Sequence, residues 1–345
     1  MSDDAVSKRK DEHIDICLNE NVGSSAHTGL SGYTLEYDAL PELDLDEIDL
    51  STEVLGKRLR APIIIGAMTG GTARARGINQ RLARAAARAG IGMALGSQRG
   101  MVADPSLAET FLVRDVAPDL PLLVGNIGAV QLNYGVDADG INGAMRAVQA
   151  DAVNLHLNAL QEAIQPEGDT RFGGLVARIA EVVPKLEVPA LVKEVGAGIA
   201  GRTAAKLAPL PIAGIEVAGV GGTSWARVES YRAPAASVQA EVGRRLAGFG
   251  IPTALAIRQC REVLGEERLI VASGGIRSGM DIAVGLALGA NVGALARPLL
   301  EAAADSEAAL QRTLETLIYE LRVICFCTGA RDVEALRRVR VLARS

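Results

Sequence analysis

A short segment near the middle of the chain concentrates side chains that could carry chemistry. His156, Asn158 and Glu162 lie close together, and an apolar run over residues 152–155 leads directly into them. A short apolar run bounded by polar residues is typical of a buried strand. Buried polar groups are unfavourable unless they are paired. The segment is therefore either a tight internal network or a site for a charged ligand.

Glu162 has the setting of a magnesium ligand. Mg²⁺ prefers oxygen ligands and usually takes one or two carboxylates together with substrate phosphates. The neighbouring groups of His156, Asn158 and Gln161 favour this interpretation over a carboxylate that only stabilises a helix N-terminus. The imidazole of His156 is as compatible with a packed, hydrogen-bonded residue as with a catalytic one.

Two turns later in the chain have the composition of a phosphate site. The segment 274–279, Gly-Gly-Ile-Arg-Ser-Gly, follows an apolar run and opens a helical segment, and Arg297 follows the next apolar run. Glycine lets backbone N–H groups approach an anion, and a helix N-terminus favours negative charge. Because barrel enzymes bind phosphate after strands seven and eight, this interpretation is favoured over two ordinary turns.

Lys193 lies inside the apolar run 189–195. A buried ammonium group needs an anionic partner. A salt bridge to Glu194 or Glu216 is one interpretation, and an ammonium facing a negative charge on a ligand is the other. The sequence does not distinguish between them.

The elements that position these residues alternate regularly. Eight short apolar runs recur, at residues 63–67, 91–96, 122–126, 152–156, 190–194, 214–218, 269–273 and 292–296. Segments of helical period, such as 76–88 and 283–288, lie between them. Strands that alternate with helices indicate a parallel sheet, and eight units favour a closed barrel. An open doubly wound sheet would usually have a Gly-x-Gly-x-x-Gly turn after its first strand, and residues 67–72 do not match it.

We therefore predict an α/β fold, a (β/α)8 TIM barrel over residues 61–345. Residues 1–60 are predicted to be an N-terminal extension that contributes to the active-site mouth. A small hairpin is expected in this extension, with a half-exposed strand over residues 44–50, where apolar and acidic residues alternate.

Composition excludes several classes of function. The net charge of −5 and the scarcity of aromatic residues argue against a nucleic-acid binder. No run approaches the ~20 apolar residues of a membrane span, and the first residues lack the apolar core of a signal peptide. The four cysteines have neither a disulfide pattern nor zinc-ligand spacing. We expect a cytoplasmic protein that binds a small molecule and neither nucleic acid nor membrane.

These motifs together resemble the type 2 isopentenyl-diphosphate delta-isomerases, a family of FMN-dependent barrels. The specific parts are the head Arg9-Lys10 with His13, and His156-Leu157-Asn158 with Gln161-Glu162. Other matching blocks run nearly the length of the chain in the family's order: residues 67–72, 96–99, 126–128, 166–169, 192–194, 221–225 and 274–277.

The resemblance implies roles for individual residues. The catalytic residues would be His156, Gln161 and Glu162, and Glu162 would ligate Mg²⁺. The substrate would contact Arg9, Lys10, His13, Ser97, Gln98, Arg99, Asn158 and Gln161. FMN would contact Ala67, Met68, Thr69, Ser97, Asn126, Lys193, Thr223, Gly275, Ile276, Arg277, Ala296 and Arg297.

The resemblance also implies a reaction, in which protons are added and removed to convert isopentenyl diphosphate into dimethylallyl diphosphate. The flavin would be reduced, usually by NADPH. The resemblance, together with the apolar stretch 317–326, also suggests a homo-oligomer.

One alternative is an FMN-dependent 2-hydroxy acid oxidase or dehydrogenase, but that chemistry needs a histidine base after strand six, and residues 217–223 contain none. Another is a non-catalytic flavin-binding module, which would not need the Arg9-Lys10 head.

Overall fold

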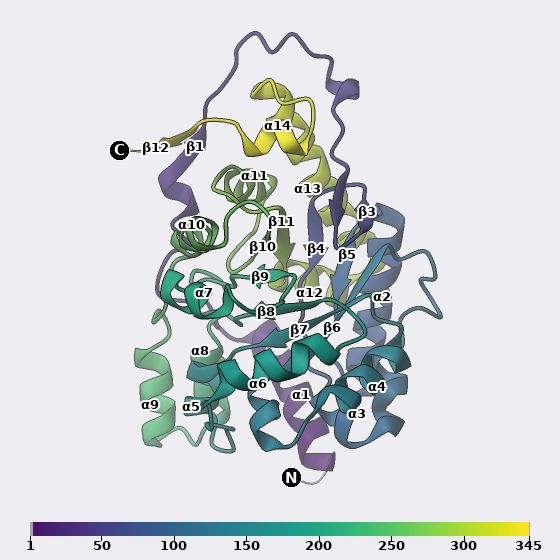
Figure 1. Cartoon of the computed structure of the whole chain (residues 1–345), viewed down its shortest axis with the longest axis vertical. Helices are drawn as coiled ribbons and strands as arrows, with labels where there is room; N and C mark the ends of the chain where they lie inside the picture. The colour runs from purple at the N-terminus through teal and green to yellow at the C-terminus, as the bar shows by residue number, and fades with distance from the viewer. Residues whose placement is uncertain (1–2, 345) are drawn as a thin grey trace.

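The centre of the molecule is a closed barrel of parallel strands (Figure 1), seen in a computed structural model that describes residues 3–344. Consecutive strands are neighbours, and the last pairs with the first. The strands are β4 (Ile63–Ile65), β5 (Gly92–Ala94), β6 (Leu122–Gly128), β7 (Ala152–His156), β8 (Ala190–Lys193), β9 (Gly214–Glu216), β10 (Leu269–Ala272) and β11 (Val292–Leu295). Each lies on one of the eight predicted runs, so the barrel prediction is confirmed.

Helices cover the outside of the barrel. The predicted helix over 76–88 is α2 (Ala73–Ala89), which begins where the Thr72 side chain accepts a hydrogen bond from the Ala75 amide. Its buried face includes Ile78 and Leu82. The other covering helices are α4 (Ala138–Val148), α6 (Leu175–Val182), α7 (Gly201–Leu207), α10 (Thr253–Leu264), α11 (Gly279–Ala287), α12 (Arg297–Asp305), α13 (Glu307–Cys327) and α14 (Val333–Arg337).

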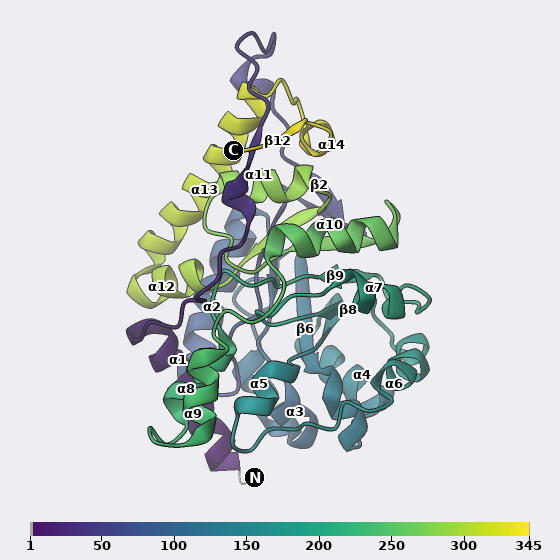
Figure 2. The ribbon, with the colours of Figure 1, turned by 90° about the vertical axis from the view of Figure 1, so that its left-hand side faces the viewer.

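Shorter elements stand at the ends of the strands. The helices are α3 (Arg99–Ala103), α5 (Ala159–Ile164), α8 (Trp225–Arg232) and α9 (Val238–Arg245). The 3-10 helices are η1 (Leu30–Gly32), η3 (Pro105–Phe111), η4 (Ala129–Tyr134) and η5 (Val183–Lys185). The long helix α1 (Asp3–Asn19) lies with α5 and α8 at one end of the molecule in both ribbon views (Figure 2).

The first 60 residues also close the opposite end of the barrel. The strands β2 (Thr52–Val54) and β3 (Lys57–Leu59) form the expected small hairpin. Its Val54 and Leu59 pack against the side chains that fill the barrel interior, which come from several barrel strands. Strand β1 (Tyr33–Leu35) pairs with β12 (Val341–Ala343) near the other end of the chain.

One expectation about a secondary element is corrected. The segment expected to be a strand over 44–50 contains the 3-10 helix η2 (Leu45–Glu47). The Asp44 and Glu47 side chains cap its first turn reciprocally, which satisfies the backbone locally without a partner strand.

The apolar stretch 317–326 lies in α13, and its Leu317 and Leu321 are buried in this chain's own core. It therefore gives no support to a homo-oligomer, which stays a prediction.

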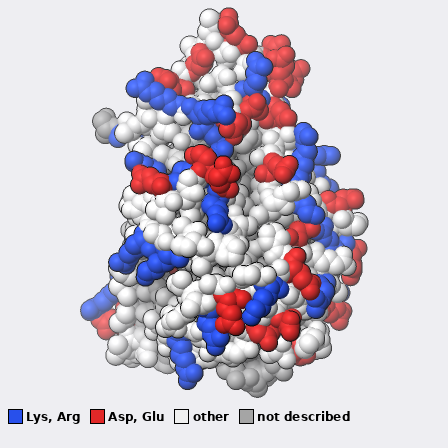
Figure 3. All heavy atoms as spheres, in the orientation of Figure 1, with Lys and Arg blue, Asp and Glu red and all other residues white. Residues whose placement is uncertain are grey.

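The surface has no dominant charge on the face seen in Figure 3, where basic and acidic side chains alternate. No helix within residues 3–344 combines the length and apolar character needed to cross a bilayer.

Candidate active site

The carboxyl ends of the barrel strands open into one cavity of about 380 Å³. Every barrel strand contributes to its wall through residues at or just after its end. These include Thr69 after β4, Ser97 after β5, Asn126 on β6, His156 on β7, Lys193 on β8, Ala218 after β9, Ser273 after β10 and Ala296 after β11.

All but one of the predicted site residues line this cavity. The exception is Gln98, whose side chain is fully buried behind the wall. Its Oε1 accepts a hydrogen bond from the Asn126 amide at 2.9 Å, so it ties the end of β5 to β6. This burial gives no support to the predicted contact between Gln98 and the substrate, which stays a prediction, whereas its neighbours Ser97 and Arg99 do face the cavity.

His156 is a neutral imidazole in this setting. Its Nδ1 lies 2.9 Å from Asn126 Oδ1, which can only accept a hydrogen bond, so Nδ1 carries the proton and Nε2 is an acceptor. Burial and the charge of Lys193 lower the pKa of His156 to about 3. The side chain can hydrogen-bond a ligand, but it is not a cation at neutral pH.

Glu162 lies in the first turn of α5 with both carboxylate oxygens hydrogen-bonded. Oε1 accepts from Asn158 Nδ2 at 2.7 Å, and Oε2 accepts from the Asp169 amide at 2.6 Å. Burial raises the pKa of Glu162. Asn158 Oδ1 is buried beside it and has no hydrogen-bond partner among the described residues.

These two residues fit a cation that shares its coordination with a ligand. Within residues 3–344, no group of three or more His, Cys, Asp or Glu side chains could hold a metal by itself. A carboxylate and an orphan amide oxygen at a cavity wall match the protein share of a magnesium site, in which phosphate and water complete the shell.

Lys193 is buried and pairs with Glu216 at 3.4 Å, and its Nζ also donates to the Glu194 carbonyl at 2.6 Å. The salt-bridge interpretation is therefore correct for Glu216. The Glu194 carboxylate instead accepts backbone N–H groups of the next residues, including Val195 and Gly196 at 2.6 Å each. Because Lys193 also lines the cavity, the ion pair and a contact with a ligand are compatible.

Two glycine turns pack face to face at the predicted phosphate site. Gly274 and Gly275 have φ values of +97° and +73°, and a Cβ on Gly222 would lie 2.5 Å from the Gly275 nitrogen. Across the described chain, the amides of Gly275 and Ile276 donate to no protein acceptor. They therefore suit an oxyanion such as the phosphate of FMN.

The N-terminus of α11 itself is not available to that phosphate, contrary to expectation. The amides of Arg277 and Ser278 donate to Asp281, and those of Gly279 and Met280 donate to Glu320. Internal carboxylates thus satisfy the helix end. The turn that precedes the helix is left to bind the anion.

Helix α1 brings cations to the same cavity. Lys10 Nζ donates to the Ser97 carbonyl at 3.0 Å, and burial together with Arg9 lowers the pKa of Lys10 to about 7. His13 Nε2 lies 3.0 Å from Glu229 Oε1, and its ring meets Trp225 edge-on. Arg9, Lys10 and Arg99 all line the cavity.

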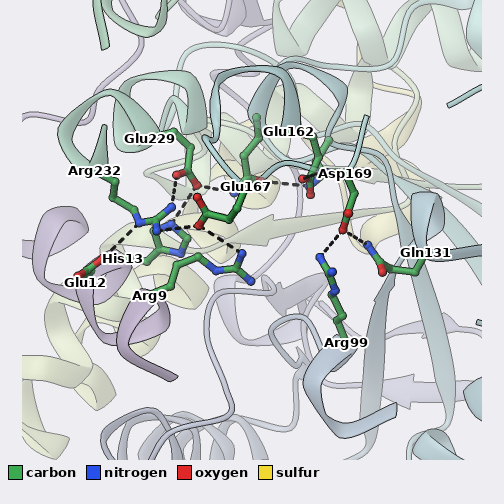
Figure 4. A network of polar contacts seen from close by, with 12 residues as sticks. Arg9, Glu12, His13, Arg99, Gln131, Glu162, Glu167, Asp169, Glu229 and Arg232 are labelled. Carbon is green, nitrogen blue, oxygen red and sulfur yellow. Dashed lines mark hydrogen bonds and ion pairs between the residues drawn. The ribbon is translucent and has the colours of Figure 1, made fainter. Parts of the chain in front are cut away.

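The residues that hold these cations in place were not predicted from the sequence (Figure 4). The side chain of Glu229 on α8 is fully buried. Its carboxylate accepts hydrogen bonds from His13, from Gln161 at 3.0 Å and from Arg232 at 2.6 Å. Burial would raise the pKa of Glu229, but these partners together lower it to about 2. The i,i+3 spacing of Glu229 and Arg232 was the one visible signal, and it is common on exposed helices.

The fold and the sequence both have known relatives. The chain matches the family described as FMN-dependent dehydrogenase over residues 16–105 and 134–343. Its fold is similar to that of mandelate oxidase in complex with (S)-2-phenylpropionate, with a TM-score of 0.68 and 17% identity, covering 99% of this chain and 97% of that chain. A mandelate oxidase variant with benzaldehyde is similar at a TM-score of 0.68 and 18% identity, covering 98% of each chain. Identities this low show the fold alone.

Much more similar sequences carry one name, isopentenyl-diphosphate delta-isomerase. The protein from Synechococcus sp. is 48% identical over 342 residues, which cover 99% of this chain and 97% of the relative. The one from Nostoc sp. is 48% identical over 345 residues, covering 99% and 98%. The one from Rickettsia canadensis is 44% identical over 334 residues, covering 97% of each. The chain belongs to the isopentenyl-diphosphate delta-isomerases, within the FMN-dependent dehydrogenase family.

Proposed function

We propose that the protein interconverts isopentenyl diphosphate and dimethylallyl diphosphate by adding a proton to one carbon and removing one from another. The observation that carries this proposal is that two sets of anion-binding groups line the same cavity. The cavity is lined by a glycine turn with free amides, and also by Arg9, Lys10 and Arg99 together with the Glu162 carboxylate. Such a cavity suits two phosphorylated ligands, a cofactor and a substrate.

FMN is the cofactor of this family, and the residues present fit it. Gly275, Ile276, Arg277, Ala296 and Arg297 would hold its phosphate. Thr69, Asn126, Lys193 and Thr223 would contact its ring, with Ala67, Met68 and Ser97 in the same wall. Reduced FMN, with NADPH as reductant, would supply an acid–base nitrogen and an electron-rich ring.

The diphosphate would be bound by charge compensation. Glu162 would hold Mg²⁺, which would compensate part of the charge of the diphosphate, and the unpaired Asn158 Oδ1 lies beside Glu162. Guanidinium groups bind phosphate in a bidentate manner, which orients the substrate as well as neutralising it. We assign the binding of the diphosphate to Arg9, Lys10, His13, Ser97 and Arg99.

His156 and Gln161 would orient the substrate without supplying charge. His156 is neutral, and Gln161 Nε2 is held by Glu229 at 3.0 Å. A neutral polar lining keeps ionised side chains away from the apolar part of the substrate, where a positive charge would develop. We propose that these two residues position the alkene for proton transfer.

The test is an anaerobic assay of the FMN-loaded protein with isopentenyl diphosphate, Mg²⁺ and NADPH in heavy water. The expected result is dimethylallyl diphosphate that carries solvent deuterium. An active flavoprotein without deuterium uptake would contradict the proton-transfer proposal. Oxidation of a 2-hydroxy acid in place of isomerisation would contradict the proposed function.

A further inference from the structure

The block of residues 165–169, between α5 and α6, contacts several groups that the proposed function uses. The Asp169 carboxylate pairs with the Arg99 guanidinium and accepts from Gln131 Nε2 at 2.9 Å. The Asp169 amide donates to Glu162 Oε2 at 2.6 Å. One residue thus connects a cation proposed for the diphosphate with the carboxylate proposed for Mg²⁺ (Figure 4).

Gly168 fixes this block against α5. A Cβ at this position would lie 1.8 Å from the Glu162 carbonyl oxygen, so no other residue fits without a shift of the backbone. The Gly168 amide also donates to the Gln165 carbonyl at 3.0 Å. The block is therefore seated directly on the turn of helix that carries Glu162.

The other end of the block contacts Arg9, the second arginine proposed for the diphosphate. Glu167 Oε1 accepts from Arg232 at 2.9 Å and lies 3.7 Å from the Arg9 guanidinium. The Gln165 amide, oriented so that both of its ends are satisfied, accepts from Arg9 at 3.1 Å and donates to Glu229 at 3.2 Å. Arg9 comes from α1 and Arg99 from α3, so the block joins two separate elements.

We propose that residues 165–169 form a positioning loop that sets Arg9, Arg99 and Glu162 in place for a magnesium diphosphate, with Asp169 as its central positioning residue. This inference rests on the proposed function. A guanidinium has five N–H donors, so Arg99 can keep Asp169 on one edge and bind phosphate with another. Because the Arg99 side chain is ordered beforehand, it loses little further conformational entropy when the substrate binds.

The first test compares Asp169→Asn with the wild type, both loaded with FMN. The probe is inorganic pyrophosphate in the presence of Mg²⁺, titrated by calorimetry. We expect about tenfold weaker binding, equivalent to about 1.4 kcal/mol, and a similar rise in KM for isopentenyl diphosphate with kcat nearly unchanged. The visible flavin spectrum should not change. Tighter binding would show that Asp169 competes with the anion for Arg99, and unchanged binding would show that Asp169 has no role in binding. Either result would overturn the proposal.

A double-mutant cycle shows whether Asp169 acts through Arg99. On an Arg99→Gln background, Asp169→Asn should weaken pyrophosphate binding by less than twofold, whereas additive losses would contradict the proposal. If Asp169→Asn fails to fold, Gln131→Met removes only the second contact of Asp169. It should weaken binding about threefold, and no change would count against the loop.

Gly168→Ala tests the contact with Glu162, and Gly173→Ala is its matched control. A Cβ at Gly173 meets nothing within 4 Å. We expect Gly168→Ala to raise the half-saturating Mg²⁺ concentration for pyrophosphate binding at least fivefold, and Gly173→Ala to leave it unchanged. Equal behaviour of the two variants would overturn the proposal. Because pyrophosphate binding needs no turnover, a wild type that binds it but does not isomerise would refute the proposed function alone.

Discussion

Lys10 is a buried amine whose charge state changes near neutral pH. Burial and the adjacent Arg9 lower its pKa to about 7, so the free enzyme holds the ammonium below that pH and the neutral amine above it. Since the cation is the form that binds a diphosphate, kcat/KM should fall as pH rises through about 7. A pH profile of kcat/KM for the wild type and Lys10→Arg measures this.

The Lys10→Arg variant keeps its charge throughout this range, because guanidinium does not deprotonate. Its kcat/KM is expected to lose the fall above pH 7, whatever its absolute value. Lys185→Arg is the control, since Lys185 is exposed on the surface. An identical alkaline fall in all three proteins would show that another group titrates.

Residue roles could be predicted only where neighbours in sequence are also neighbours in space. His156, Asn158, Gln161 and Glu162 lie on one strand end and the helix that follows, so their grouping follows from the local chain. Glu229 contacts Gln161 from α8, far along the chain, and no local pattern indicates that contact. Gln98 has the residue type of a ligand-binding group, but its side chain turns to the Asn126 amide behind the wall.

At the scale of elements, the apolar runs were enough to predict all eight barrel strands. The runs are buried apart from the partly exposed Ala67, Leu269 and Ala296, which is typical of parallel strands covered by helices. The segment over 44–50 alternates in the same way as a strand, yet the Asp44 and Glu47 caps satisfy its backbone as a 3-10 turn. Periodicity alone cannot separate these cases when no partner strand is known.

The turn after β8 depends on one carboxylate. Glu194 Oε2 accepts backbone N–H groups of Val195, Gly196, Ala197 and Gly198, and two of these residues line the cavity. Glu194→Leu would leave four partly buried amides without an acceptor and should lower the free energy of unfolding by about 3 kcal/mol. Urea unfolding of the FMN-bound protein measures this. Glu241→Gln, on the surface of α9, should change it by less than about 0.5 kcal/mol, and an equal effect of both would contradict the role of Glu194.

At the scale of the whole molecule, the two ends of the barrel have separate tasks. The β2–β3 hairpin closes the amino end with Val54 and Leu59, while α1, α5 and α8 stand around the cavity at the carboxyl end. Substitutions at the amino end should therefore affect mainly stability, and substitutions at the carboxyl end mainly activity, as in other TIM barrels.

Leu59→Ala tests this separation. Leu59 is fully buried in the barrel interior, so its truncation should cost about 3 kcal/mol of unfolding free energy. KM and kcat for isopentenyl diphosphate should stay within about twofold of the wild type, since the site lies at the other end. A large change in KM with unchanged stability would show that the two ends are coupled.

The central claim is that one cavity holds the flavin and a metal-bound diphosphate side by side. The most direct measurement is a crystal structure of the protein with FMN, Mg²⁺ and isopentenyl diphosphate under reducing conditions. We expect the FMN phosphate at the Gly275 turn, Mg²⁺ on Glu162 and the diphosphate between Arg9 and Arg99. A diphosphate bound away from Glu162 and Arg99 would contradict it.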